Sequence, residues 1–313
     1  MTTEMAPISS ESPATSGPAT YEIARRKHPW RVVAAVLVLV VLGLLAFGVA
    51  NAKGLHWSVT GHYLLTRVVF YGFLRTLELT AAAMALGLCL GVIFGIMRLS
   101  HNPVLSSVAW LYVWAFRGTP LIVQLFMWFN LALIFPHVDL FGLVHLTTVK
   151  VMSPFLAALL AFGINEGAYM SEIIRGGLMS VPPGQTEASL SLGASRGWTM
   201  RRVVLPQALR VILPTIGNET LGMLKLTSLA AFISFNELFG TVETIYYSNS
   251  QVMELLIVAA VWYLFASSVL SIGQYYLERR VGRGFVRGGR KQTLLEAVLV
   301  NAWAKRRRLG SNW

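Results

Sequence analysis

PFLAALLAFGINEGAYMSEIIRGGLMSVPPGQTEASLSLGASRGWTMRRVVLP, residues 154–206, contains two segments of opposite character. The first, Pro154–Ile174, is apolar and long enough to cross a hydrocarbon layer of about 30 Å at 1.5 Å per helical residue. The second, Arg175–Pro206, is polar and far longer than a link between two spans requires. It contains a helix-prone core, Gln185–Leu192, followed by Gly193, and glycine suits the left-handed position that closes a helix. We therefore expect a membrane span followed by a short external helix that docks on another protein.

The composition places most of the chain away from water. Hydrophobic residues make up 55% of the 313 residues and charged residues only 13%, whereas an average soluble domain has about 25% charged residues. The net charge is +12, and the basic residues flank apolar runs, so anionic lipid is a simpler partner than nucleic acid. The single cysteine, Cys89, allows neither an internal disulfide nor a cysteine metal cluster, and the six histidines have no metal-ligand spacing.

Six apolar segments are predicted to cross the membrane, so the expected fold is an all-α membrane protein. Residues 104–135 are too long for one perpendicular span, and we divide them into an interfacial helix, Val104–Phe116, and a span. Arg117 then lies at the membrane edge, and Pro214 lies in the first turn of the fifth span. The predicted spans are Val32–Ala50, Leu77–Met97, Thr119–Phe135, Pro154–Ile174, Pro214–Ser234 and Val252–Gly273.

The basic residues predict an orientation, because cytoplasmic loops carry the excess of Lys and Arg. With the N-terminus inside, 21 basic residues lie on the inner side and four on the outer side, and Lys225 lies within the fifth span. The four outer residues are Lys53, Arg67, Arg75 and Lys150. We therefore predict cytoplasmic N- and C-termini and a cytoplasmic position for the loop 175–206.

The N-terminal region precedes the predicted membrane domain. Residues 1–30 are expected to form a disordered tail with a basic end, because Ser, Thr, Pro and Ala without periodicity cannot build a core. Residues 31–51 are expected to form an extra span. Ala50-Asn51-Ala52 resembles a signal-peptide cleavage site, but the apolar run of 19 residues is longer than the usual 7–15, so we favour an uncleaved anchor.

The loop 175–206 carries a spaced pattern of residues. Glu187-Ala188-Ser189 is followed by three residues, Gly193, nine residues and Val203-Val204-Leu205-Pro206. This pattern resembles the EAA loop of binding-protein-dependent ABC permeases, which reads EAA, three, G, nine, I, one, LP; Ser189 and Val203 are conservative departures. In that family the short helix of the loop sits in a groove of the ATPase subunit. The resemblance implies that Glu187, Ala188, Ser189 and Gly193 are ATPase-coupling residues, with an ordinary amphipathic loop helix as the alternative.

Further segments resemble the polar amino-acid subfamily of these permeases, whose members carry histidine, glutamate, glutamine, arginine or opines. The segments are Arg117-Gly118-Thr119-Pro120 with Leu121 and Gln124, Tyr169–Pro182, and Leu213-Pro214 through Lys225 to Leu229. The subfamily usually has an aspartate where this chain has Leu226, so an acidic partner for Lys225 is missing or comes from elsewhere.

The resemblance covers nearly the whole predicted membrane core and implies its organisation. Residues 70–278 would form a five-helix ABC permease domain with the cytoplasmic coupling loop 175–206, and residues 31–51 would add one helix to it. Residues 279–313 form a basic cytoplasmic tail. Within the tail, Thr293–Ala304 is predicted as an apolar helix on anionic lipid or, alternatively, as a partner-binding helix.

The resemblance implies a transmembrane subunit that moves a polar amino acid across the plasma (inner) membrane into the cytoplasm. No Lys follows a Gly, so the sequence lacks the phosphate loop G-x-x-x-x-G-K-[ST], and ATP and Mg are expected on a partner ATPase. We expect no catalytic residue, cofactor or metal on this chain. The expected partners are an ABC ATPase dimer, a second permease copy or paralogue, an extracytoplasmic substrate-binding protein and the lipid bilayer.

Polar side chains inside the predicted spans are candidates for the substrate path, because an ionisable group near the membrane centre costs at least about 2.5–3.5 kcal/mol. Glu219 and Lys225 lie about 240° apart around a helix and are not expected to pair. For Glu166 and Lys225, a salt bridge between the two spans is an alternative of equal weight to a substrate role. For the Ser and Thr candidates, the alternative is that their hydroxyls only hold membrane helices together. The candidates are Asn165, Glu166, Asn218, Glu219, Lys225, Thr227 and Ser228.

Other functions remain as alternatives. A secondary transporter driven by an ion gradient would not need the docking loop 175–206. A membrane-anchored enzyme would need a nucleophile or a metal cluster in a loop, and we find neither in the sequence. The amino acid carried, and whether the permease pairs with itself or with a paralogue, do not follow from the sequence.

Overall fold

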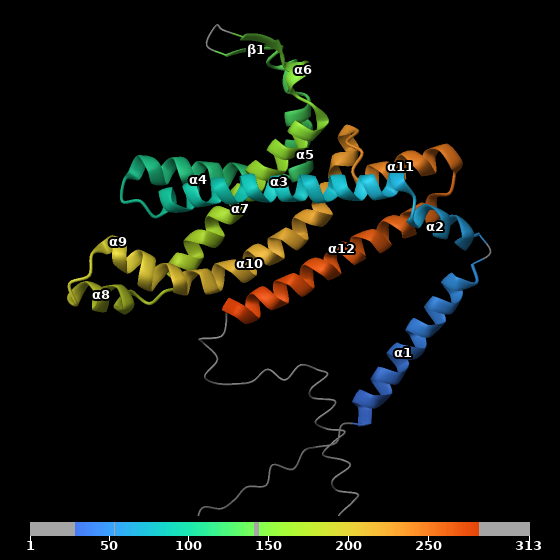
Figure 1. Cartoon of the computed structure of the whole chain (residues 1–313), viewed down its shortest axis with the longest axis horizontal. Helices are drawn as coiled ribbons and strands as arrows, with labels where there is room; N and C mark the ends of the chain where they lie inside the picture. The colour runs from blue at the N-terminus through green and yellow to red at the C-terminus, as the bar shows by residue number, and fades with distance from the viewer. Residues whose placement is uncertain (1–28, 53, 141–143, 282–313) are drawn as a thin grey trace, which may run out of the picture. The chain divides into compact units, whose positions relative to one another are not determined.

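The computed structural model of the chain describes residues 29–52, 54–140 and 144–281. These residues form helices with short connections and one short hairpin (Figure 1). By internal contacts the chain divides into two units, Met1–Leu55 and His56–Trp313. The predicted tail helix Thr293–Ala304 and nearly all of the predicted N-terminal tail lie outside the described residues.

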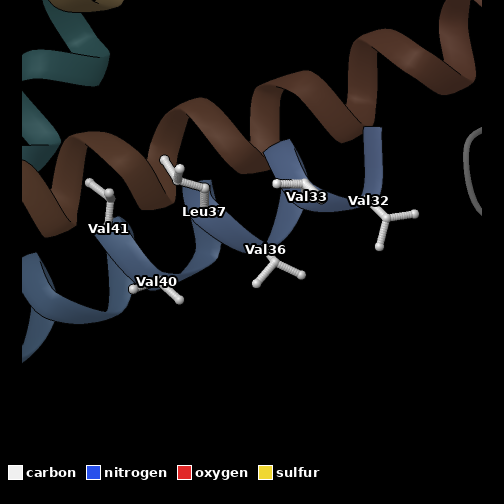
Figure 2. Close-up of a pocket in the computed structure, with 6 residues that line it drawn as sticks. All are labelled: Val32, Val33, Val36, Leu37, Val40 and Val41. Atoms are coloured by element: carbon white, nitrogen blue, oxygen red, sulfur yellow. The ribbon is translucent and has the colours of Figure 1, made fainter. Parts of the chain in front are cut away.

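The first unit contains a single described helix, α1, Pro29–Ala50. From Val32 to Ala50 its sequence is apolar throughout, and Val36 and Val40 are more than half exposed. Figure 2 shows that the shallow hollow on this helix is lined only by valine and leucine side chains. A helix that is apolar on all sides is typical of a membrane span, and α1 matches the predicted span Val32–Ala50 to within three residues.

Two long helices, α3 (Arg67–Arg98) and α7 (Pro154–Met179), form the centre of the second unit. They contact each other through glycines: Gly87 faces Glu166, and Gly91 faces Met170. A Cβ atom at Gly91 would lie 2.3 Å from the Met170 Cβ, so only glycine permits this approach. Because the contacts advance by four residues along both helices, α3 and α7 run parallel, and small residues at this spacing are typical of packed membrane helices.

Helix α3 begins ten residues before the predicted start of the second span. The first turns of α3 contain charged and hydroxyl residues, and these turns lie outside the predicted span. In the structure Arg75 pairs with Glu78 on the surface at 3.1 Å, and the Thr76 hydroxyl donates to Glu237 at 2.9 Å. Because these polar groups find partners within the fold, the helix extends over them. A short helix, α2 (Trp57–Leu64), precedes it.

The segment predicted to break near Gly118 does break there. Helix α4 (Pro103–Gly118) and helix α5 (Leu121–Phe129) are separated by Thr119 and Pro120 in extended conformations. Helix α4 packs along α3 and α7, and α5 continues along α7; the interfacial position predicted for Val104–Phe116 stays a prediction. The two helices therefore behave as one discontinuous helix that runs against α7. The 3-10 turn η1, Leu131–Leu133, follows α5.

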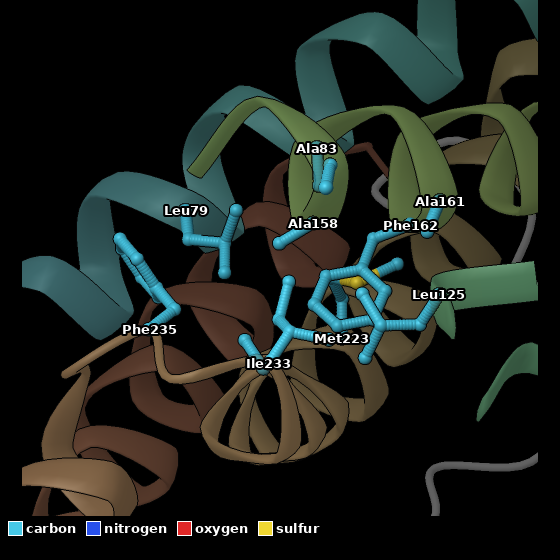
Figure 3. Close-up of a cluster of buried hydrophobic side chains, with 11 residues drawn as sticks. Leu79, Ala83, Leu125, Ala158, Ala161, Phe162, Met223, Ile233 and Phe235 are labelled. Atoms are coloured by element: carbon cyan, nitrogen blue, oxygen red, sulfur yellow. The ribbon is translucent and has the colours of Figure 1, made fainter. Parts of the chain in front are cut away.

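A buried apolar cluster joins α3, α5 and α7 to the segment that follows α10. Figure 3 shows Phe162 of α7 beside Leu125 of α5 and Met223 of α10, with Ile233 below them. Alanine side chains at 157, 158 and 161 let α7 approach its neighbours closely. This cluster fixes the position of the α4–α5 break relative to α7.

A β-hairpin departs from the predicted all-α fold. Strand β1 (His137–Leu140) pairs antiparallel with β2 (Val144–Thr147), and the short helix α6 (Thr148–Val151) leads into α7. We expected only a connection here, because short strands lack a strong sequence pattern. The hairpin stands at the end of α5 (Figure 1).

Helix α10 (Leu205–Leu226) passes through Pro214, so the prediction that Pro214 starts the fifth span was wrong; Pro206 occupies the first turn. A 3-10 segment, η3 (Thr227–Ile233), continues the helix, and Ser234 ends it with a φ of 59°. The chain then forms α11 (Leu238–Asn249) and α12 (Val252–Val281). Helix α12 packs on α10 and extends eight residues beyond the predicted end of the sixth span.

Three described helices have the length and apolar composition of membrane spans: Val32–Ala50, Arg67–Arg98 and Val252–Val281. Helices α7 and α10 are longer than 18 residues but are interrupted by ionisable residues, and α4 and α5 are short because the helix is broken. The number of spans therefore stays a prediction for these helices.

Candidate functional site

The loop between α7 and α10 folds into a compact helical unit. Helix α8 (Pro183–Ser191) is followed by α9 (Arg196–Thr199) and a π-helical turn, η2 (Met200–Val204). The predicted helix Gln185–Leu192 is thus confirmed to within two residues. Gly193 adopts a φ of +80°, the left-handed conformation that the sequence predicted for it.

Hydroxyl groups hold this unit together. The Ser189 and Thr199 hydroxyls are buried and lie 2.8 Å apart, so they join α8 to α9. The Ser195 hydroxyl accepts a hydrogen bond from the Trp198 amide and caps α9. Ser189, one of the predicted coupling residues, therefore faces into the unit, whereas Glu187 and Ala188 are exposed.

The surface of this unit carries apolar side chains. Leu192 is 89% exposed and Trp198 is 54% exposed, and Glu187 of the same unit is exposed as well. The unit lies at the end of the bundle where α7 ends, far from α2 and α11 (Figure 1). Exposed apolar side chains on a polar loop are typical of a protein–protein contact surface.

A second polar group of residues lies at the α4–α5 break. The Gln124 amide donates to the Phe116 carbonyl at 2.9 Å and to the Thr119 hydroxyl at 2.7 Å. The Asn165 amide of α7 donates to the same Phe116 carbonyl at 2.7 Å and to the Gln124 carbonyl oxygen at 3.3 Å. These side chains satisfy backbone groups that the break releases, which is how broken membrane helices are tolerated. Discontinuous helices in membrane transporters commonly line substrate sites.

Glu166 follows Asn165 and is the least satisfied carboxylate in the described part of the chain. It is 4% exposed, and its Oε1 atom is buried without a hydrogen-bond partner. Glu219 lies on α10, which packs against α7. The alternative bridge from Glu166 to Lys225 is not formed: no ion pair among the described residues joins them. A buried carboxylate without a basic partner can bind a cationic group.

The remaining candidates from α10 and η3 do not join this group. The Asn218 side chain accepts from Gln274 of α12 at 3.0 Å. The Thr227 and Ser228 hydroxyls donate to carbonyls three residues earlier, at 2.8 and 2.7 Å, which is the helix-holding role that we weighed against substrate contact. Lys225 is exposed. The structure thus places Asn165 and Glu166 next to each other on α7, and Glu219 on α10, which packs against α7.

Glu237 is a fully buried carboxylate that we did not identify from the sequence. It falls in the outer loop between the fifth and sixth predicted spans. Its Oε2 accepts from the Thr76 hydroxyl at 2.9 Å and from the Tyr263 hydroxyl at 2.8 Å, and its Oε1 accepts from the Gly240 amide at 2.8 Å. These contacts connect α3, α11 and α12. Only the position of Glu237 immediately before an apolar helix could have indicated a capping role.

Within the described ranges, no group of three or more His, Cys, Asp or Glu side chains could hold a metal ion.

The ion pair of Arg98 was not predicted from the sequence either. Its Nε donates to Glu172 at 3.3 Å, and Arg175 contacts the same carboxylate at 2.7 Å.

Comparison with known proteins gives consistent relatives. Residues 87–283 match the family described as binding-protein-dependent transport system inner membrane component. The chain is 42% identical over 276 residues to the arginine transport system permease protein ArgU of Corynebacterium glutamicum, covering 88% of this chain and 87% of that protein. It is 36% identical to the glutamine transport system permease protein GlnP of Escherichia coli, covering 67% of this chain and 91% of that protein. A crystal structure of an amino acid ABC transporter with histidines superposes with a TM-score of 0.60 at 34% identity, over 68% of this chain and 94% of that chain.

Proposed function

The chain belongs to the family of binding-protein-dependent transport system inner membrane components and is the permease subunit of an ABC amino-acid importer, and from this premise we propose how it is coupled and what it carries. We propose that α8 and α9 dock on a separate ATPase subunit and transmit its closure to the membrane helices. The cargo is a polar amino acid that moves into the cytoplasm.

The exposed surface of the α8–α9 unit is the observation that carries the coupling proposal. Leu192 and Trp198 offer apolar contact area, and the exposed Glu187 offers a charge on the same unit. The Ser189–Thr199 contact makes α8, α9 and η2 one piece, and η2 continues directly into α10. A force applied to α8 would therefore reach α7 at one side and α10 at the other.

The carboxylates of Glu166 on α7 and Glu219 on α10 support the cargo proposal. Glu166 and Glu219 would receive the ammonium group of an amino acid, and the Asn165 amide would lie beside it. The exposed Lys225 remains a candidate partner for the cargo carboxylate. The names of two relatives describe them as arginine and glutamine transport permeases. Both compounds carry the ammonium and carboxylate groups that such a site would recognise.

The expected assembly follows from the same premise. An ATPase dimer would supply ATP and Mg, a second permease copy or paralogue would complete the path, and an extracytoplasmic binding protein would deliver the cargo. The subunit itself has a transport role and no catalytic one. The α8 end of the bundle, which carries Arg175 and the basic residues of the loop, would face the cytoplasm in the plasma (inner) membrane.

Photo-crosslinking in cells tests the docking surface directly. A benzoyl-phenylalanine at position 187 is expected to crosslink to an ATPase subunit identified by mass spectrometry. The same residue at position 247 serves as the control, because Tyr247 is 76% exposed at the other end of the bundle. Crosslinks to the ATPase from position 247 but not from position 187 would overturn the proposal.

A further inference from the structure

A cavity on the second unit lies outside both sites described above. It has a volume of about 350 Å³ and is lined by Arg98 of α3, by Trp110, Trp114 and Arg117 of α4, and by Glu172 of α7. None of these side chains takes part in the α8–α9 surface or in the contacts around Glu166. The cavity combines basic groups with large aromatic rings, which are two different means of binding one ligand.

The charges around the cavity do not balance. Three arginines, Arg98 and Arg117 in the lining of the cavity and Arg175 beside it, face a single carboxylate in the lining, that of Glu172. Arg98 and Arg175 both contact Glu172. Arg117 has no acidic partner among the described residues; its guanidinium lies 4.9 Å from the centre of the Tyr169 ring. The site therefore carries an excess of positive charge and unused N–H donors.

The aromatic side chains give the cavity an apolar wall. The Trp110 and Trp114 rings stack with centroids 6.1 Å apart and planes within 12° of parallel. They are 52% and 62% exposed, so they face outward from the bundle. Tryptophan is enriched at the boundary between hydrocarbon and headgroups, where one part of the ring system is apolar and one part is polar.

The depth of the cavity corresponds to such a boundary. Glu172 lies 18 residues after Pro154, which is about 27 Å along a helix and close to the thickness of a hydrocarbon core. Beyond Glu172, α7 continues for two turns and connects to α8. A bilayer that begins near Pro154 would therefore place its headgroups at Arg98 and Glu172, with the Arg117 guanidinium over the Tyr169 ring, three residues before Glu172 on α7.

We propose that this cavity binds the phosphate headgroup of an anionic phospholipid from the leaflet on the α8 side. Arg98 and Arg117 donate to the phosphate, and Trp110 and Trp114 lie against the glycerol and the first part of the acyl chains. Glu172 keeps Arg98 and Arg175 in place and disfavours a second phosphate. Basic pockets between membrane helices bind anionic headgroups in this way.

The test uses the full chain purified in detergent and titrated with phosphatidylglycerol or phosphatidylcholine whose chains are brominated. Bromine quenches tryptophan fluorescence at short range, so phosphatidylglycerol is expected to quench at lower concentration than phosphatidylcholine. Arg117→Gln is expected to weaken phosphatidylglycerol binding roughly fivefold, since one basic residue near anionic lipid contributes about that factor. The matched control, Arg75→Gln, changes an exposed arginine at the other end of α3 and is expected to leave binding unchanged.

Three results would overturn the proposal. They are equal quenching by the two lipids, equal loss of binding in Arg75→Gln and Arg117→Gln, and an undiminished difference in quenching between phosphatidylglycerol and phosphatidylcholine when both Trp110 and Trp114 are replaced by Phe. Protection by inorganic phosphate with no binding of phosphatidylglycerol would assign the cavity to a soluble anion and would also contradict it. A circular dichroism spectrum that matches the unmodified chain establishes that Arg117→Gln is folded.

Discussion

Helices α7 and α8 are neighbours in sequence but differ in their surroundings. Thirteen of the 26 residues of α7 are buried, whereas Ser189 alone is buried among the nine residues of α8. Substitutions of the buried apolar residues of α7 therefore disturb packing as well as transport. Substitutions on α8 can remove a contact to another protein while leaving the fold intact, and this difference allows stability and function to be measured separately.

The largest effect is expected at the contact between α3 and α7. Gly91→Val would place a branched side chain where the Met170 Cβ would be 2.3 Å from the first added carbon. Overpacking of this kind typically costs about 1–3 kcal/mol and can exceed that where backbone atoms are close. We expect a strong loss of folded chain in the membrane, measured by fluorescence-detection size-exclusion chromatography.

Gly222→Ala is the control for this substitution, because no atom lies within 4 Å of the added carbon and the residue is in the helix α10. It should be neutral or slightly stabilising. Equal amounts of folded Gly91→Val and Gly222→Ala protein would show that the α3–α7 contact is wrong.

The next effect is expected for Glu166→Gln, which removes one carboxylate from the proposed cargo site. Because Oε1 of Glu166 has no hydrogen-bond partner, stability should be unchanged. Loss of one charged contact to the cargo, worth about 1.5–3 kcal/mol, should lower uptake by about tenfold or more. Uptake of labelled amino acid per folded permease and thermal stability in detergent are the two measurements.

Glu237→Gln gives the matched comparison on a second buried carboxylate. Glu237 accepts three hydrogen bonds, so this substitution should cost about 1–3 kcal/mol of stability. The assignment of Glu166 to the cargo would be refuted if both variants lost stability equally while uptake per folded Glu166→Gln chain stayed normal.

These two carboxylates also show what could be predicted from the sequence. Glu166 was identified because an acidic residue inside an apolar run is conspicuous. Glu237 was missed because its burial depends on Thr76 and Tyr263, which are distant in sequence and lie on other helices. The sequence contains no local signal of such a contact.

Helix ends likewise could be predicted where a local residue determines them and could not where packing determines them. The end of α8 was predicted because Gly193 is itself the local cause of the turn. The start of α10 was predicted wrongly because Pro214 is compatible with a first turn, and only the packed structure decides that Pro206 takes that position. The break between α4 and α5 was predicted from length, but the packing of α4 along α7 depends on contacts that periodicity does not encode.

A smaller effect is expected for Gly193→Ala. The space around Gly193 is open, so the substitution adds no clash, but its φ of +80° costs an alanine about 1–2 kcal/mol. We expect the α8–α9 unit to loosen, so that limited proteolysis within residues 183–204 becomes faster while the melting temperature of the chain changes little. A large drop in melting temperature would mean that the unit is part of the main core.

The smallest effect is expected for Ser189→Ala. It removes the hydroxyl contact to Thr199, which is worth about 0.5–1.5 kcal/mol, and leaves an apolar side chain of similar size. Uptake should stay within about twofold of the unmodified chain. A severe transport defect without any change in proteolysis would indicate that Ser189 itself contacts the partner.

The central claim is that the exposed face of α8 binds a separate ATPase subunit, and the substitution Glu187→Lys tests this claim most directly. The measurement is the amount of ATPase that co-purifies with the tagged permease from its native membrane, together with amino-acid uptake. We predict that Glu187→Lys lowers both by at least about tenfold with normal folded yield, while the charge reversal Glu78→Lys at the opposite end of α3 changes neither. Full ATPase recovery and normal uptake with Glu187→Lys would contradict the account.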